Sequence, residues 1–116
     1  MLFYIKLVLT FNCAIHQIRS QLNSMQNKIF SVECRVNHAK TYYECNDLSQ
    51  TLSECRLLTT ALIFRCNSEI GQLTTINTVE ANSDRNTIKS MEQECYALKS
   101  RMTHLSYEVT IRESLI

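Results

Sequence analysis

The sequence predicts an all-α protein of elongated coiled-coil helices, with breaks or skips near residues 44–50 and 77–87. Proline is absent and glycine occurs once in 116 residues, so few tight turns are encoded, because these two residues supply the backbone angles that turns need. Apolar residues make up 45% of the chain and recur at intervals of three and four, which is the helical period. They form narrow stripes, which are typical of helices that pack along one line.

The first predicted segment, residues 1–43, carries the most regular stripe. Its a and d heptad positions are all apolar or aromatic, whereas the e positions hold polar residues such as Arg19, Gln26 and Glu33. A repeat of 3.5 residues keeps one line of side chains facing a neighbour as helices supercoil. We therefore expect a continuous coiled-coil helix that ends at Tyr43.

The second segment, residues 44–80, carries a stripe that is displaced by two residues relative to the first. A smooth supercoil absorbs such a shift poorly, which predicts a kink or turn. Thr51 and Glu54 form a T-x-x-E capping box, so we expect a helix to restart there. The run LLTTALIF at 57–64 is apolar on most sides, which predicts burial on more than one face, as where three or four helices meet.

The third segment, residues 81–116, begins within the polar run NTVEANSDRNT, which is the best loop candidate in the chain. Its stripe is offset by one residue from the second and is broken at Arg112. An alternative to the rod is an antiparallel three-helix bundle that folds back at the two breaks. We favour the rod, because a helix over 1–43 would be about 60 Å long at 1.5 Å per residue, longer than the segments that would cover it.

The candidate functional residues are the apolar positions of the three stripes, which we expect to contact a partner helix. This interaction seam comprises Val8, Phe11, Ile15, Ile18, Leu22, Met25, Ile29, Val32, Val36, Leu48, Leu52, Leu62, Leu73, Ile76, Ile88, Met91, Leu98, Met102, Leu105 and Val109.

The predicted function is that of a non-enzymatic structural or interaction protein, or a fragment of one. It would self-associate or bind partner helices, as a homo-oligomer or a hetero-complex, in the manner of a scaffold or cytoskeletal coiled coil. The chain has no phosphate-binding loop, nucleophile elbow or H-E-x-x-H pattern, so no catalytic residue, cofactor or metal is predicted. Basic residues do not cluster, and nucleic-acid binding is therefore not expected.

Six cysteines, at positions 13, 34, 45, 55, 66 and 95, lack the C-x2-C spacing of zinc sites. Those at 45, 55, 66 and 95 fall on the stripes, where Cys behaves as a small hydrophobe. Metal or redox chemistry through Cys is a further hypothesis, and Cys34 with His38 is the nearest pair of metal ligands.

Residues 1–14 have some features of a signal peptide. However, no positive charge precedes their apolar run, Lys6 interrupts it, and it is too short to span a bilayer. We therefore expect an intracellular protein, cytoplasmic or cytoskeletal, and membrane association is not expected. The alternative, if residues 1–14 are a signal peptide, is a small secreted or membrane-associated helical protein that is crosslinked through its cysteines.

Overall fold

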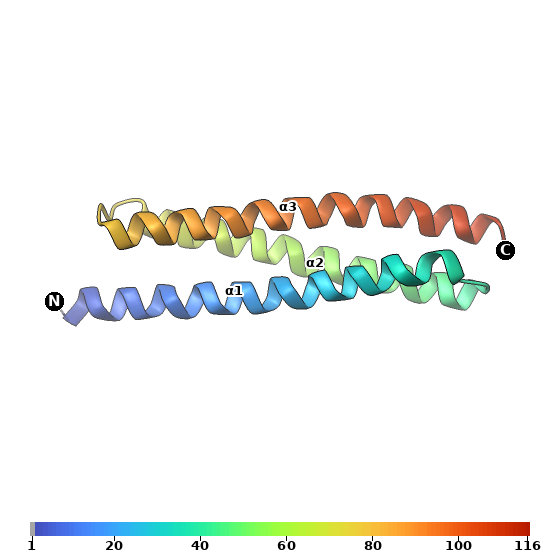
Figure 1. Ribbon diagram of the computed structural model, residues 1–116, viewed down its shortest axis with the longest axis horizontal. Coiled ribbons are helices and arrows are strands. Elements are labelled where there is room, and N and C mark those ends of the chain that lie inside the picture. Colours follow the sequence, from blue (N-terminus) through green and yellow to red (C-terminus); the bar gives the residue numbers. More distant parts are fainter. Residues whose placement is uncertain (1) are drawn as a thin grey trace.

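The computed structural model describes the backbone of residues 2–116 and the side chains of residues 13–116. Within this part of the chain, three long α-helices pack side by side: α1 (Leu2–Arg35) and α3 (Val79–Ser114) run in the same direction, and α2 (Tyr42–Leu73) is antiparallel to both (Figure 1). A short 3-10 turn, η1 (Val36–His38), follows α1. The molecule measures 63 × 18 × 17 Å. The all-α class is confirmed, and the chain takes the folded-back arrangement, the elongated three-helix bundle.

The chain reverses direction at residues 39–41 and 74–78, nearer the N-terminus than the predicted breaks. A threonine caps the helix that follows each reversal. Thr41 accepts a hydrogen bond from the Glu44 N–H at 3.1 Å, and Thr78 accepts one from the Ala81 N–H at 3.1 Å. Such caps satisfy amide groups that have no partner in the first helical turn.

The expected helix restart at Thr51 is wrong, because Thr51 and Glu54 lie inside α2. The chain uses another T-x-x-E, ten residues earlier, in which the Glu44 carboxylate accepts from the Lys40 N–H at 3.1 Å. Both copies of the pattern satisfy the same spacing rule, and only the earlier one follows a segment that leaves the helix.

The expectation of one helix as far as Tyr43 is also wrong, since α1 ends at Arg35. Ala39 takes an extended conformation, with φ −65° and ψ 126°, and the apolar spacing continues across this break by coincidence. Ala39 is buried, but Tyr43 is 81% exposed. Within the described residues no backbone φ is positive, so this turn requires neither glycine nor proline.

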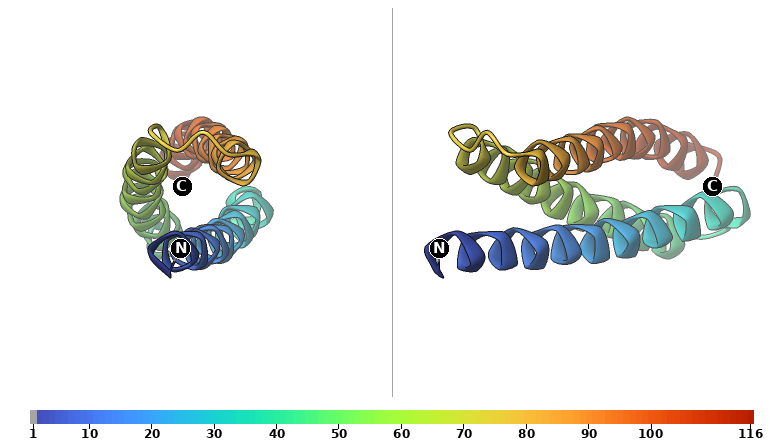
Figure 2. Two further views of the ribbon diagram at one scale, coloured as in Figure 1. Left: turned by 90° about the vertical axis from the view of Figure 1, so that its left-hand side faces the viewer. Right: turned by 60° about the vertical axis from the view of Figure 1, so that its left-hand side comes forward.

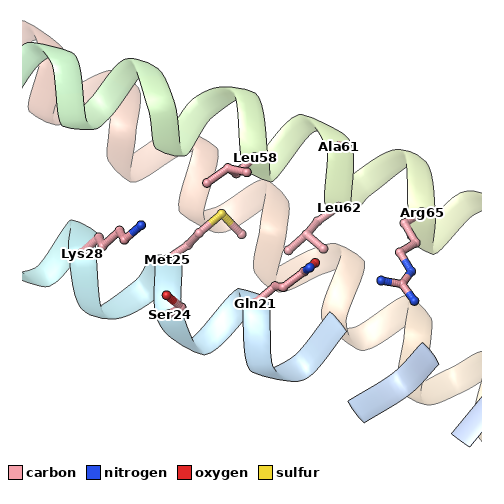
Figure 3. Close-up of a pocket in the computed structure, with 8 residues that line it drawn as sticks. All are labelled: Gln21, Ser24, Met25, Lys28, Leu58, Ala61, Leu62 and Arg65. Carbon is pink, nitrogen blue, oxygen red and sulfur yellow. The ribbon is translucent and has the colours of Figure 1, made fainter. Parts of the chain in front are cut away.

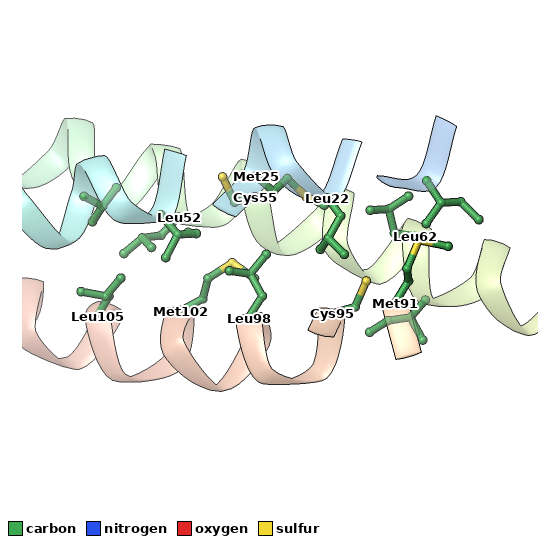
Figure 4. Packing of buried hydrophobic residues seen from close by; sticks show 14 of the residues in the cluster. Leu22, Met25, Leu52, Cys55, Leu62, Met91, Cys95, Leu98, Met102 and Leu105 are labelled. Atoms are coloured by element: carbon green, nitrogen blue, oxygen red, sulfur yellow. The ribbon is translucent and has the colours of Figure 1, made fainter. Parts of the chain in front are cut away.

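The three helices surround a common axis (Figure 2), and their stripes meet in a single core along it (Figure 4). Each fully buried Leu, Ile or Val contributes roughly 1.5 to 3 kcal/mol when it leaves water. The polar residue Thr59 is also buried, and its hydroxyl donates to the Cys55 carbonyl at 2.7 Å. Burial of this hydroxyl is therefore compensated.

Candidate helix-docking site

The structure places the predicted interaction seam inside the bundle. Val8 and Phe11 lie outside the described side chains, Ile15 and Ile76 are partly buried, and the other seam residues are buried among the chain's own helices. In the closed bundle these side chains contact one another. The surface that the closed bundle presents to a partner therefore consists of the remaining residues.

An exposed apolar surface lies on the outer side of α2. It consists of Leu57, Leu58, Ala61 and Phe64, which we name the α2 patch. Leu57 is 74% exposed, Leu58 51% and Phe64 71%, and Ala61 is also exposed. The run LLTTALIF is thus buried on one side of α2 and exposed to solvent on the other, so the expectation that it is buried on more than one face is wrong. Contiguous exposed apolar side chains of this kind mark interaction surfaces in soluble proteins.

A groove between α1 and α2 adjoins the α2 patch (Figure 3). Its volume is ≈ 280 Å³. The lining residues are Gln21, Ser24, Met25 and Lys28 from α1, with Leu58, Ala61, Leu62 and Arg65 from α2. The floor contains the buried side chains of Met25 and Leu62, and the two cationic residues lie at opposite ends (Figure 3). The groove therefore has an apolar centre with a positive charge at each end.

None of the described residues that line this groove is acidic. The Arg65 guanidinium donates a hydrogen bond to the side-chain oxygen of Gln17, which is neutral. Within residues 13–116 neither Lys28 nor Arg65 forms an ion pair. Both cations are consequently available to a carboxylate from outside the bundle.

Unlike the groove between α1 and α2, the contact between α1 and α3 is bridged by ion pairs along its length. Both guanidinium nitrogens of Arg19 donate to Glu94, at 3.0 and 2.7 Å, and Arg101 pairs with Glu33. The hydrogen bonds from Arg19 lower the pKa of Glu94, and the same contact raises the pKa of Arg19. These pairs cover the apolar core on that side, whereas the middle of the α1–α2 contact has no such pair among its described residues.

The heptad pattern did not reveal the α2 patch, because Leu57, Leu58, Ala61 and Phe64 lie off the stripe. The available signal was the run LLTTALIF, which carries more apolar residues than one narrow seam can bury. The α1 side of the groove gave no signal, since Gln21, Ser24 and Lys28 look like ordinary surface residues.

The cysteines divide into two groups. Cys13 and Cys34 are exposed, whereas Cys45, Cys55, Cys66 and Cys95 are buried, as their positions on the stripes predicted. Among the residues that the structure describes, no three His, Cys, Asp or Glu side chains converge as metal ligands. Over the same residues, none of the helices is both apolar and long enough to cross a bilayer.

Comparison with known proteins gives no match, whether to family models, to curated proteins or to solved structures.

Proposed function

We propose that the protein is a non-enzymatic interaction protein that binds an amphipathic helix of another protein along the α1–α2 groove and the α2 patch. The partner would lie as a fourth helix on the bundle. The observation that supports this most strongly is the exposure of Leu57, Leu58 and Phe64 within eight residues of one helix, beside a groove with an apolar floor. In helix-in-groove binding, an amphipathic helix lays its apolar face into a hydrophobic groove.

The α2 patch alone would give only a weak complex. Covering these three apolar side chains yields at most about 3 to 6 kcal/mol, because full burial of one is worth about 1.5 to 3 kcal/mol and the three are only 51 to 74% exposed. Association itself costs an estimated 4 to 15 kcal/mol, so the two quantities are similar. Measurable affinity therefore requires further contacts, and the two cations of the groove are placed to supply them.

The charges favour an acidic partner. A helix with an apolar stripe and carboxylates on its flanks would place a negative charge near Lys28 and another near Arg65. Two copies of this chain that paired through the groove would instead bring cation against cation, whether they ran parallel or antiparallel. Such like-charge contacts disfavour a complex. We therefore favour a hetero-complex over self-association.

A pair of synthetic peptides tests this proposal. Both have Leu at the a and d positions of three heptads, and one has Glu at e and g where the other has Lys. The Glu peptide should bind the protein and the Lys peptide should not, as measured by fluorescence anisotropy. Equal binding of the two peptides, or binding of neither, would contradict the proposal.

Two variants of the protein localise the binding. Leu58→Asp places a like charge beside the carboxylates of the peptide and removes an apolar anchor, so it should weaken binding of the Glu peptide at least tenfold. The matched control is Tyr107→Ser, because the native ring is 65% exposed and belongs to α3, which contributes no residue to the lining of the groove. Binding that responds equally to both variants would place the peptide elsewhere.

A second candidate function follows from the exposed thiols of Cys13 and Cys34 on α1. These residues are accessible for disulfides between chains, which is the crosslinked assembly expected of a secreted protein. Intact mass after oxidation, with and without reductant, tests it. A reducible dimer that Cys34→Ser or Cys13→Ser abolishes would support this function, and a persistent monomer of 13.5 kDa would exclude it.

A further inference from the structure

Two buried cysteines face each other across the contact between α2 and α3. Cys66 belongs to α2 and Cys95 to α3, and both side chains have 0% exposure. The hydrogen bond from Arg56 to the Ser106 hydroxyl, 3.0 Å long, shows the register of these antiparallel helices. Cys66 lies ten residues after Arg56 in α2, and Cys95 lies eleven residues before Ser106 in α3. They are therefore opposite one another in the core, and each thiol lies close enough to shift the pKa of the other.

Facing positions on packed helices satisfy the geometry of a disulfide. Packed helix axes lie about 8 to 10 Å apart, and Cα atoms lie about 2.3 Å from the axis. Two Cα atoms that point at each other are then roughly 3.4 to 5.4 Å apart, a range that overlaps the roughly 4.4 to 6.8 Å that disulfides span. The two thiols can join without separation of the helices.

The same two sulfurs do not make a metal site. A structural zinc ion takes four ligands in tetrahedral arrangement, and the described residues contain no group of three converging ligands. The chemistry that two facing thiols perform without further ligands is oxidation to a disulfide.

We propose that Cys66 and Cys95 form a reversible intrachain disulfide in the core, with hydrogen peroxide as the oxidant. The Cys95 thiolate attacks one peroxide oxygen, the O–O bond breaks, and the products are a sulfenic acid on Cys95 and hydroxide. Cys66 then attacks the sulfenic sulfur and displaces its oxygen, which leaves as water with the Cys66 proton. The hydroxide of the first step takes up the proton that Cys95 had released and gives the second water. Two thiols and one peroxide molecule give one disulfide and two molecules of water.

The contact between the thiols assigns these roles. The neighbouring Cys66 thiol lowers the pKa of Cys95, and the neighbouring Cys95 sulfur raises the pKa of Cys66. Since the thiolate is the nucleophile in this chemistry, Cys95 reacts first and Cys66 resolves the intermediate. Peroxide is close to water in size, and local opening of the bundle gives it access to the core.

The disulfide would fasten α2 to α3 and leave α1 without a crosslink. It closes the loop that contains the reversal at 74–78 and therefore restricts the unfolded chain. For a loop of this length in a protein of this size we expect the thermal midpoint to rise by about 10 °C. Reductant should restore the original midpoint.

Peptide mapping of the full-length protein tests the pairing. The folded protein is treated with peroxide, remaining thiols are alkylated after denaturation, and the chain is digested with trypsin. Cleavage after Arg65, Arg85, Lys89 and Lys99 releases peptides 66–85 and 90–99, each with one cysteine. We expect these two peptides to be joined and to separate on reduction. Recovery of both as alkylated thiols, or as separate sulfinic acids, would overturn the proposal.

Two cysteine variants test whether this disulfide causes the expected rise in the thermal midpoint of unfolding. Cys66→Ala should abolish the joined peptide and the peroxide-dependent rise in midpoint. Cys55→Ala is the matched control, because Cys55 is also buried in α2, and it should retain both. A rise that survives in Cys66→Ala would show that another pair is responsible. Peptide mapping uses the native protein alone. It therefore tests the pairing even if one of the variants folds poorly.

Discussion

Replacement of Leu22 by alanine tests whether the stripes of this chain pack against one another within a single molecule. Leu22 has 0% exposure and belongs to the core cluster shared by all three helices (Figure 4). A substitution at such a site removes buried methyl groups and leaves a cavity, at a cost of about 2 to 5 kcal/mol. In a protein of this size a loss of about 3 kcal/mol lowers the thermal midpoint by roughly 10 °C.

Circular dichroism during heating and urea titration measures this loss. Leu57→Ala is the control, since Leu57 is 74% exposed, and it should change stability by no more than about 0.5 kcal/mol. Because the core is intramolecular, the midpoints of the native protein and of Leu22→Ala should not change with protein concentration. A dimeric rod behaves differently, since mass action makes its midpoint rise with concentration.

Two results would be incompatible with this packing. Equal losses for Leu22→Ala and Leu57→Ala would show that the assigned buried and exposed faces are wrong. Midpoints that rise steadily with concentration would show that the stripes are filled by a second chain.

Two further predictions concern the helix cap and one ion pair. Thr41→Ala should destabilise the protein by about 1 kcal/mol, because the Glu44 N–H loses its acceptor, and urea titration measures the change; a loss within experimental error would contradict the cap. Glu94→Gln should cost at most about 1 kcal/mol near pH 7, since the side chains of the Arg19–Glu94 pair are 40% and 35% exposed. The pKa of Glu94 is lowered by Arg19, so this stability is present above the ordinary glutamate pKa of 4.5 and is lost as the pH falls through the lower folded value. Urea titrations at about pH 7 and about pH 3 should show the difference between native and variant protein shrinking at the lower pH, and a constant difference would contradict the pair.

The helical stripes were predictable from the sequence, because side-chain burial follows the period of three and four. The stripe positions between Ile18 and Val36 are buried as that period requires, and most residues between them are exposed. The position of the first reversal was not predictable in this way. The turn uses right-handed and extended backbone angles that any residue adopts, and the T-x-x-E pattern occurs at both Thr41 and Thr51. The absence of proline and the single glycine therefore favoured long helices without revealing that the chain folds back.

The candidate site was predictable only in part. The run LLTTALIF shows an excess of apolar residues over one seam, and its outer residues Leu57, Leu58 and Phe64 are the exposed ones. The α1 side of the groove could not be predicted from the heptad pattern. Which flank of α1 faces α2 depends on how the three helices are arranged around the axis, and a heptad pattern is the same for either arrangement. Lys28 could therefore not be assigned to a groove before the fold was known.

The most direct test of the docking surface is a map of amide chemical shifts in the native protein as the Glu-flanked peptide is added. We expect the largest changes in residues 21–28 of α1 and 57–65 of α2, with small changes elsewhere. Changes centred on the outer side of α3, around Tyr96 and Tyr107, or no changes at saturating peptide, would contradict docking in the α1–α2 groove.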